Sequence, residues 1–254
     1  RRRHFVAAVR AAAGDDFLGG RLLLRQPETG ARAGSDAVLL AAAVPAKPGE
    51  RALELGCGAG AAMLCLAARV PGLMVSGIEV DAEAAGLVAA NARQNRLADR
   101  VDVITGDIAD PPATMPAEGF DHVFANPPFF AAGHGTPAPA PARARARMAP
   151  ATDLDGWLRL AARMLRPGGS VTVIGRAERL DDLLAACRRR FGAIVLFPLW
   201  PGGGKPAKRV ILQGRKGSRA GLRLAPGLVL HGSGHAYSEA AEAVLRHGAA
   251  LDLR

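Results

Sequence analysis

An alternation of short apolar runs with helix-like stretches constrains the fold of this chain more than any other feature of its sequence. Strands that alternate with helices pack as a mostly parallel sheet that carries helices on both faces. We therefore expect an α/β fold built on a seven-stranded, mostly parallel sheet. The predicted strands are residues 52–55, 74–79, 101–104, 122–125, 170–174, 193–199 and 209–213.

The helical stretches between these strands carry start and stop signals. Asp81 precedes the second stretch, where an aspartate can accept backbone hydrogen bonds as an N-cap. Thr152 and Asp155 form the pattern of a capping box at the third stretch, and Gly168 suits the turn that follows it. The predicted helices cover residues 61–69, 83–95, 153–165 and 177–190.

The first strand leads into a glycine-rich turn, with Gly56, Gly58 and Gly60, where a helix begins. Glycines permit a tight turn and let a ligand approach the backbone closely. Two cofactors are compatible with this pattern. In a dinucleotide-binding loop, Glu79 at the end of the second strand would hold a ribose. In the S-adenosylmethionine loop of Rossmann-like methyltransferases, E/D-x-G-x-G-x-G, Glu54 supplies the acid.

Three features favour S-adenosylmethionine over a nicotinamide dinucleotide. A dinucleotide loop has no use for Glu54, which would lie near the pyrophosphate. Asp107 ends the third strand in the sequence TGD, where a carboxylate can accept a hydrogen bond from an adenine amino group. The fourth strand runs into the sequence NPPF at residues 126–129, and hydride transfer offers no role for that loop.

The NPPF sequence suits methylation of an amino or amide nitrogen. The lone pair of an aromatic amine is delocalised, and two acceptors, the Asn126 side-chain oxygen and the Pro127 carbonyl, can localise it by binding both N–H groups. Phe129 can stack on the base, and the prolines keep the acceptors fixed. Because parallel sheets bind ligands beyond the carboxyl ends of their strands, we expect Asn126 to meet Glu79 and Asp107 in one crevice.

The composition predicts a globular chain that does not span a membrane. The chain has 254 residues, 49% of them apolar, which is enough for a sizeable core. No apolar run approaches the roughly 20 residues that a membrane helix needs. The three cysteines form no CxxC pair, which favours the reducing cytoplasm and offers no zinc spacing. We expect a cytoplasmic protein whose site holds no metal.

Two segments stand out among the basic residues behind the net charge of +10. Residues 205–223 carry seven Lys or Arg and no acid, and residues 143–147 carry three arginines. Such blocks favour a polyanionic partner, above all RNA or DNA, and the alternative is a solvated basic face. The predicted nucleic-acid-binding residues are Arg143, Arg145, Arg147, Lys205, Lys208, Arg215, Lys216 and Arg219.

Beyond these motifs, the chain resembles the bacterial tRNA(Val) adenine-N6 methyltransferase family from about Phe17 to its end. Residues 25–42 are similar to the segment before the sheet in that family, which contains GxDAxLL. Residues 228–245 are similar to its closing strand and its YSEA helix. The resemblance implies a Rossmann-like class I methyltransferase that uses S-adenosylmethionine and binds tRNA.

The same resemblance implies further site residues, and the chain as a whole has an expected division. Gly34, Ser35 and Asp36 would close over the methionine end of the donor. We expect residues 1–30 to form an N-terminal extension, and residues 31–254 to form a single methyltransferase domain with a basic C-terminal part.

The expected activity is transfer of a methyl group to the exocyclic N6 of a tRNA adenine next to the anticodon. NPPF also occurs in methyltransferases that act on protein glutamine, rRNA guanine N2 and DNA adenine, so these acceptors stay open. A non-catalytic RNA-binding protein on the same scaffold is another alternative. The intact Gly56, Gly58, Asp107 and Asn126 argue against it.

Overall fold

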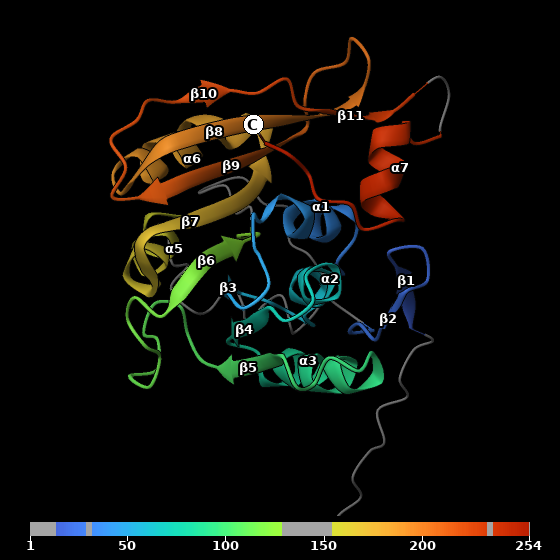
Figure 1. Cartoon of the computed structure of the whole chain (residues 1–254), viewed down its shortest axis with the longest axis vertical. Coiled ribbons are helices and arrows are strands. Elements are labelled where there is room, and N and C mark those ends of the chain that lie inside the picture. Colours follow the sequence, from blue (N-terminus) through green and yellow to red (C-terminus); the bar gives the residue numbers. More distant parts are fainter. Residues whose placement is uncertain (1–13, 29–31, 129–153, 233–235, 254) are drawn as a thin grey trace, which may run out of the picture.

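Strands and helices alternate along much of the chain in the computed structural model, which describes residues 14–28, 32–128, 154–232 and 236–253 (Figure 1). The strands are β1 (Asp15–Phe17), β2 (Leu22–Leu24), β3 (Arg51–Leu55), β4 (Met74–Glu79), β5 (Val101–Thr105), β6 (Phe120–Ala125), β7 (Leu165–Arg176), β8 (Phe191–Gly202), β9 (Arg209–Lys216), β10 (Arg223–Leu224) and β11 (Leu228–His231). The helices are α1 (Ser35–Ala43), α2 (Ala61–Arg69), α3 (Ala82–Gln94), α5 (Leu154–Met164), the 3₁₀ turn η1 (Ala177–Arg179), α6 (Leu180–Arg188) and α7 (Glu239–Leu245). Within these ranges no helix is both long and apolar enough to cross a bilayer.

The central sheet follows the order β10-β8-β9-β7-β6-β3-β4-β5, and β11 pairs with β8 beside this path (Figure 1). Strands β5, β4, β3, β6 and β7 are parallel to one another, and β9 is antiparallel to both of its neighbours. The predicted α/β class is therefore confirmed, and the seven predicted strands correspond to β3 through β9. The described sheet has nine strands rather than seven. Of the two additional strands, β11 falls in the segment that resembles the closing strand of the family, whereas β10 is too short to give a periodic pattern; both form along the edge of β8.

The predicted helix starts have different outcomes. Asp81 caps α3 as predicted, because its side chain accepts hydrogen bonds from the amides of Glu83 and Ala84. Thr152 lies outside the described residues, and Asp155 instead forms ion pairs with arginines just after α6. The predicted helix over residues 177–190 is wrong at its start, where a 3₁₀ turn precedes α6. That turn is tied to the loop before β9, since the amide of its first residue donates to the carbonyl of Lys208.

Two apolar layers hold the helices on opposite faces of the sheet. Helices α1, α2, α3 and α7 share one buried cluster with residues such as Ala52 of β3. Helices α5 and α6 share the other cluster with Leu53 and Leu55 of the same strand. The alternation of side chains along a strand explains this division, and it leaves the strand ends free to carry a site.

The short hairpin formed by β1 and β2 packs on the same layer as α1 and α2. Phe17, Leu22 and Leu24 are buried in that cluster. The side chain of Asn95 at the end of α3 also bonds the amide and the carbonyl of Leu23. The hairpin is thus anchored to the helical layer, and the expected boundary at residue 30 stays a prediction.

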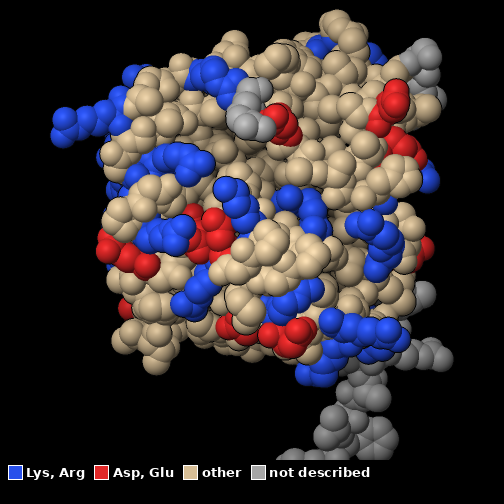
Figure 2. All heavy atoms as spheres, viewed as in Figure 1, with Lys and Arg blue, Asp and Glu red and all other residues tan. Residues whose placement is uncertain are grey.

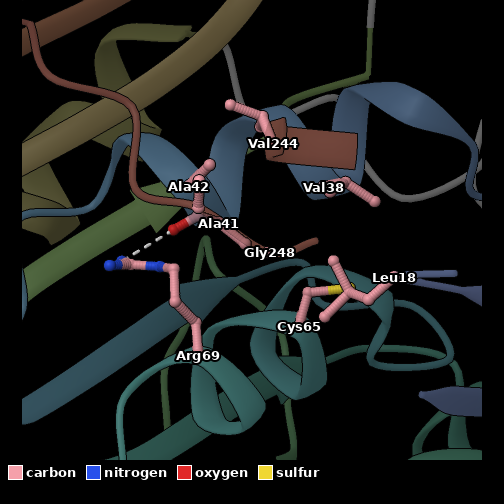
Figure 3. A pocket seen from close by; sticks show the side chains of 9 residues that line it. Leu18, Val38, Ala41, Ala42, Cys65, Arg69, Val244 and Gly248 are labelled. Carbon is pink, nitrogen blue, oxygen red and sulfur yellow. Dashed lines mark hydrogen bonds between the residues drawn. The ribbon is translucent and has the colours of Figure 1, made fainter. Parts of the chain in front are cut away.

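The cavity between α1, α2 and α7 is too small to be a ligand site (Figure 3). Its volume is about 10 Å³, which is room for about one water molecule. Arg69 of α2 lines it and donates to the carbonyls of Ala41 and Val44, at 3.0 and 2.6 Å. The arginine therefore satisfies the last carbonyls of α1 and has a structural role.

A series of hydrogen-bonded polar side chains crosses β6 near its amino end. His122 lies 2.8 Å from the Ser170 hydroxyl through Nδ1 and 2.8 Å from Glu50 through Nε2. Burial lowers the pKa of His122 despite the carboxylate beside it. Burial alone would raise the pKa of Glu50, but hydrogen bonds from His122 and the Lys47 amide outweigh it and lower that pKa. His122 is therefore held inside the fold at the amino end of β6, at the edge opposite to Asn126.

We expect the hydrogen-bonded side chains of Glu50, His122 and Ser170 to make the protein less stable as the pH falls from about 7 to 5. The unfolded state takes up a proton on histidine near pH 6.5, whereas folded His122 resists protonation. Stability is therefore lost below pH 6.5, by at most about 1.4 kcal/mol per pH unit, and Glu50 adds a loss below its own ordinary pKa of 4.5. Urea unfolding of the wild type and of His122→Gln at pH 7.5 and 5.5 measures it. The variant should be less stable at pH 7.5 but lose less on acidification; parallel losses would contradict the assignment.

Candidate active site

The glycine-rich turn between β3 and α2 has a backbone that ordinary residues rarely adopt. Gly56, Gly58 and Gly60 all have positive φ, at 62°, 55° and 86°. A Cβ on Gly56 would lie 2.6 Å from Cη2 of Trp157, so the indole packs directly on the turn. A Cβ on Gly58 would meet no atom within 4 Å. The turn is thus supported from one side and open at Gly58, where a ligand can approach the backbone.

Glu54 links the strand before this turn to the helix after it. The side chain is buried, and Oε2 accepts a hydrogen bond of 2.9 Å from the amide of Met63 in the first turn of α2. Burial raises the pKa of Glu54 well above its usual value, and the nearby charge of Glu79 acts in the same direction. The predicted cofactor-binding acid therefore holds the start of the helix, and its direct contact with a ligand stays a prediction.

Two acids stand at the neighbouring carboxyl ends of β4 and β5. Glu79 accepts hydrogen bonds from the amides of Gly58 and Asp81, at 2.8 and 3.0 Å, so it also orders the glycine-rich turn. Asp107 accepts from the amide of Ala109 at 2.8 Å through Oδ1. The register pairs the ends of the two strands, so both acids face the same edge of the sheet.

Val80 is a candidate site residue that the sequence analysis missed. It directly follows Glu79 and is 53% exposed, which is unusual for an apolar side chain at the end of a buried strand. It stands between the glycine-rich turn and Asp107, where the flat ring of a nucleoside can lie against it. The available signal was its place directly after a strand-ending acid.

Asn91 is a second residue that sequence reasoning did not find. It is fully buried in α3, and its amide group bonds the amide and carbonyl of Arg25 and the carbonyl of Ala59. Ala59 belongs to the glycine-rich turn. Asn91 therefore ties this turn to the segment after β2, and an asparagine in an otherwise apolar helix face was the only hint.

Asn126 follows β6 directly and stands beside the glycine-rich turn, because Ala125 pairs with Leu55. Its Oδ1 atom is buried and has no hydrogen-bond partner among the described residues. A buried acceptor without a partner costs about 1–3 kcal/mol, which a bound N–H donor would offset. Pro127 is buried next to it, whereas Phe129 lies outside the described residues.

Gly34 and Asp36 approach the same edge from the start of α1. The carboxylate of Asp36 accepts a hydrogen bond of 2.8 Å from Nε of Arg209, the first residue of β9. Gly34 is exposed, and a Cβ there would meet no atom within 4 Å. The ion pair fixes the start of α1 beside the site. Contact of Gly34 or Asp36 with the methyl donor stays a prediction.

The fold divides the predicted basic segment between two edges of the sheet. Lys205 and Lys208 are exposed in the loop before β9, on the side of the site. Arg215, Lys216 and Arg219 follow at the far end of β9, about 20 Å away along the strand. The placement therefore favours the two lysines as contacts for a substrate bound at the site.

Lys216 is engaged within the protein. Its ammonium donates to Glu118 at 2.8 Å and to the carbonyl of Leu165 at 2.6 Å. Arg215 likewise donates to the carbonyl of Gly168 at 3.0 Å. Figure 2 shows Lys and Arg spread over the viewed face, with Asp and Glu among them. The predicted contacts Arg143, Arg145 and Arg147 lie outside the described residues.

Thiol and metal chemistry find no support in the described ranges. Burial raises the pKa values of Cys65 and Cys187 to about 12, and burial also raises the pKa of Cys57 well above its usual value. Among the described residues, no three His, Cys, Asp or Glu side chains are grouped as ligands for a metal ion. The polar side chains described at this edge of the sheet include the carboxylates of Glu79 and Asp107 and the amide of Asn126.

We expect Gly56→Ala to destabilise the protein by about 1–3 kcal/mol, because the added methyl meets Trp157 and the backbone is left-handed. Gly86→Ala is the matched control. Gly86 lies inside α3 with open space around it, so alanine should add about 0.5–1 kcal/mol of stability. Thermal unfolding of both variants checks this. Equal melting temperatures would mean that the turn relaxes freely around the new methyl group.

The fold and the residues gathered at this edge of the sheet define an S-adenosylmethionine-dependent N-methyltransferase of the Rossmann-like class I. The family model described as methyltransferase small domain matches residues 31–192. A tRNA1(Val) (adenine(37)-N6)-methyltransferase of Dickeya chrysanthemi is 30% identical over 221 residues, which cover 85% of this chain and 86% of that protein. The chain therefore belongs to the methyltransferase small domain family and, more closely, to the tRNA1(Val) (adenine(37)-N6)-methyltransferases.

Two further proteins are also similar to this chain. A crystal structure of a predicted O-methyltransferase from Agrobacterium tumefaciens is similar with a TM-score of 0.72 and 28% identity, over 86% of this chain and 99% of that one. The rRNA N(6)-adenosine-methyltransferase metl-5 of Caenorhabditis elegans is 28% identical over 141 residues, 56% of this chain and 58% of that protein.

Proposed function

We propose that this enzyme methylates the exocyclic N6 of an adenine in tRNA, at the position next to the anticodon. The observation that carries the proposal is the buried Oδ1 of Asn126 beside the glycine-rich turn, which has no hydrogen-bond partner in the described part of the chain. An acceptor in that state suits an amino group that arrives with the substrate. The similarity over most of the chain to the tRNA1(Val) (adenine(37)-N6)-methyltransferase of Dickeya chrysanthemi supports the RNA class and the position.

Asn126 and Pro127 would hold the acceptor nitrogen. The Asn126 oxygen and the Pro127 carbonyl each accept one of its two N–H groups, so the lone pair is turned toward the donor. Pro127 is buried and its ring fixes the backbone, so these acceptors need little rearrangement during the reaction. Phe129 would stack on the adenine.

The residues on the donor side fit S-adenosylmethionine. When bound, it supplies a methyl group that passes from its sulfur to N6, which releases one proton. Gly58 leaves room for it, and Val80 offers an apolar wall for its adenine. Glu79 would accept from the ribose hydroxyls and Asp107 from the adenine amino group, while Gly34 and Asp36 would lie at the methionine end. Alignment of donor and acceptor supplies most of the rate enhancement in such reactions. We therefore expect the fixed positions of the residues at this edge of the sheet to contribute most to catalysis.

A tRNA substrate also fits the surface beside the site. Lys205 and Lys208 are exposed at the edge that carries Asn126, and phosphates would neutralise them. Because we propose tRNA as its substrate, we also assign the enzyme to the cytoplasm. The buried, unpaired Cys57, Cys65 and Cys187 are compatible with a reducing setting.

Incubation with labelled S-adenosylmethionine and separate pools of tRNA, rRNA, DNA and protein tests the proposal. We expect label in tRNA, released on digestion as N6-methyladenosine. The similarity to an rRNA N6-adenosine methyltransferase makes rRNA the second candidate acceptor. Label in rRNA alone would transfer the proposal to that substrate, and label in protein or in guanosine would overturn it.

A further inference from the structure

An open groove at the end of β8 has the features of a nucleotide-binding surface. We call it the Trp200 groove; its lining residues are Trp200, Gly202, Gly203, Gly204, Lys205, Pro206 and Val229. Its volume is about 550 Å³, within the range of sites that hold small ligands. None of these residues is acidic.

A hydrogen bond from its ring nitrogen holds the indole of Trp200 in place. Its Nε1 donates to the carbonyl of Pro226 at 3.1 Å. Gly227 follows with a positive φ of 85°, and a Cβ there would lie 2.7 Å from Nε1, so only glycine lets the chain pass this close. The single hydrogen-bond donor of the ring is thus used within the protein. What the ring can offer a ligand in the groove is its apolar surface, which suits stacking rather than hydrogen bonding.

Val229 of β11 extends this apolar surface. It pairs in register with Trp200 and is 39% exposed. In Figure 1, β11 lies along the end of β8, so the two side chains come from adjacent strands. Together they form a floor that a flat aromatic ligand can cover.

The groove carries positive charge without acids in the same segment. Residues 183–238 contain ten Lys or Arg and no Asp or Glu. Lys205 lines the groove and Lys208 follows in the same loop, and both are exposed. In the described part of the chain, neither lysine takes part in an ion pair. An aromatic floor beside free ammonium groups complements a base that carries a phosphate.

The sheet register places the groove at the same edge as Asn126. One level across β6, β7, β9 and β8 is formed by Ala125, Val173, Leu212 and Leu196. β8 runs parallel to β6, and Trp200 lies four residues beyond Leu196 in that direction. The groove therefore stands beyond the carboxyl edge, three strand spacings or about 14 Å to the side of β6.

We propose that the Trp200 groove binds a second, unpaired nucleotide of the RNA substrate, with its base on Trp200 and its phosphates toward Lys205 and Lys208. This inference rests on the proposed function, and it adds a contact that holds the RNA while the target adenine occupies the site. Recognition by stacking is tolerant of sequence, because every base has an aromatic face. The groove would thus set affinity and orientation rather than choose the methylated base.

Steady-state methylation of a tRNA(Val) transcript by Trp200→Leu and Trp200→Phe tests the stacking contact. Trp200→Leu should raise the KM for tRNA about 5- to 150-fold, keep kcat at saturating tRNA within about threefold, and leave S-adenosylhomocysteine affinity unchanged. Trp200→Phe keeps a ring and should lie much nearer to wild type. Val229→Glu reaches the same floor without touching the indole anchor, and should also raise the KM.

The lysines are tested by salt titration of tRNA binding. In Lys205→Ala/Lys208→Ala, the slope of log affinity against log salt should flatten by about 1.4 to 1.8, for two lost phosphate contacts. The matched control is Lys47→Ala/Arg93→Ala, which removes the same charge from exposed positions at the opposite edge and should keep the wild-type slope.

The possible failures are distinguishable. A wild-type enzyme that methylates no tRNA would remove the proposed function itself. A wild type that methylates tRNA, with unchanged KM in both Trp200→Leu and Val229→Glu, would overturn the groove alone. If Trp200→Leu does not fold, Val229→Glu and the lysine pair decide: a normal KM together with a wild-type salt slope would overturn the inference.

Discussion

Replacing Asn126 with alanine is expected to lower the rate of methyl transfer about 10²-fold or more while donor binding stays nearly unchanged. The side-chain oxygen is buried, lacks a partner among the described residues and stands beside the glycine-rich turn, so its loss removes an acceptor aimed at the substrate. The donor would rest on other residues, above all Glu79 and Asp107. Single-turnover rates with labelled donor measure the first effect, and calorimetry with S-adenosylhomocysteine measures the second.

Asn126→Asp is the informative companion to this variant. It keeps a side-chain oxygen at the same distance from the backbone, so it should retain more activity than alanine. Turnover close to wild type in Asn126→Ala would remove this residue from the mechanism. Loss of donor binding in the same variant would mean that Asn126 belongs to the donor site instead.

Asp107→Ala should weaken S-adenosylhomocysteine binding about 10- to 150-fold, because a charge-assisted hydrogen bond is worth roughly 1.5–3 kcal/mol. Asp107 follows β5 at the same edge as Glu79, with Val80 exposed next to that acid. Its Oδ1 already accepts from the amide of Ala109, which leaves Oδ2 for a ligand. Calorimetry on the folded variant provides the measurement.

Asp102→Ala is the matched control for this prediction. Asp102 lies at the other end of β5, and its carboxylate accepts from the Ser76 hydroxyl at 2.7 Å. The same change of residue there should leave donor affinity at the wild-type value. Affinity unchanged in Asp107→Ala as well would mean that the adenine of the donor lies elsewhere at this edge of the sheet.

Local features of the chain were readable from the sequence because their causes are local. Strand β4 has the bounds that its apolar run predicts, and so does helix α2. Asp81 caps α3 because a cap needs only the next turn of the chain. Gly56 and Gly58 have the left-handed backbone that their place after a strand indicates. These features depend on steric and hydrogen-bonding rules that act over a few residues.

The partners of individual side chains were not readable in the same way. Glu54 has the residue type and position of a ligand-binding acid, yet its carboxylate is engaged by the amide of Met63. Lys216 belongs to a basic run in the sequence, yet Glu118 and a backbone carbonyl occupy its ammonium. Asn91 orders the glycine-rich turn from 32 residues away. Each partner depends on which segments the sheet brings together.

The alternating fold, the glycine-rich turn and the NPPF loop at a strand end follow from the sequence, because periodicity and backbone restriction act between neighbouring residues. The use of the basic segment depends on the assembled fold. Lys205 and Arg219 are close in the chain, but β9 carries them to opposite edges of the sheet. Only the tertiary structure also placed Trp200 beside Val229, through the pairing of β11 with β8. An extended strand moves its ends about 3.3 Å apart per residue, and its neighbours come from distant parts of the chain, so a surface is a property of the assembled sheet.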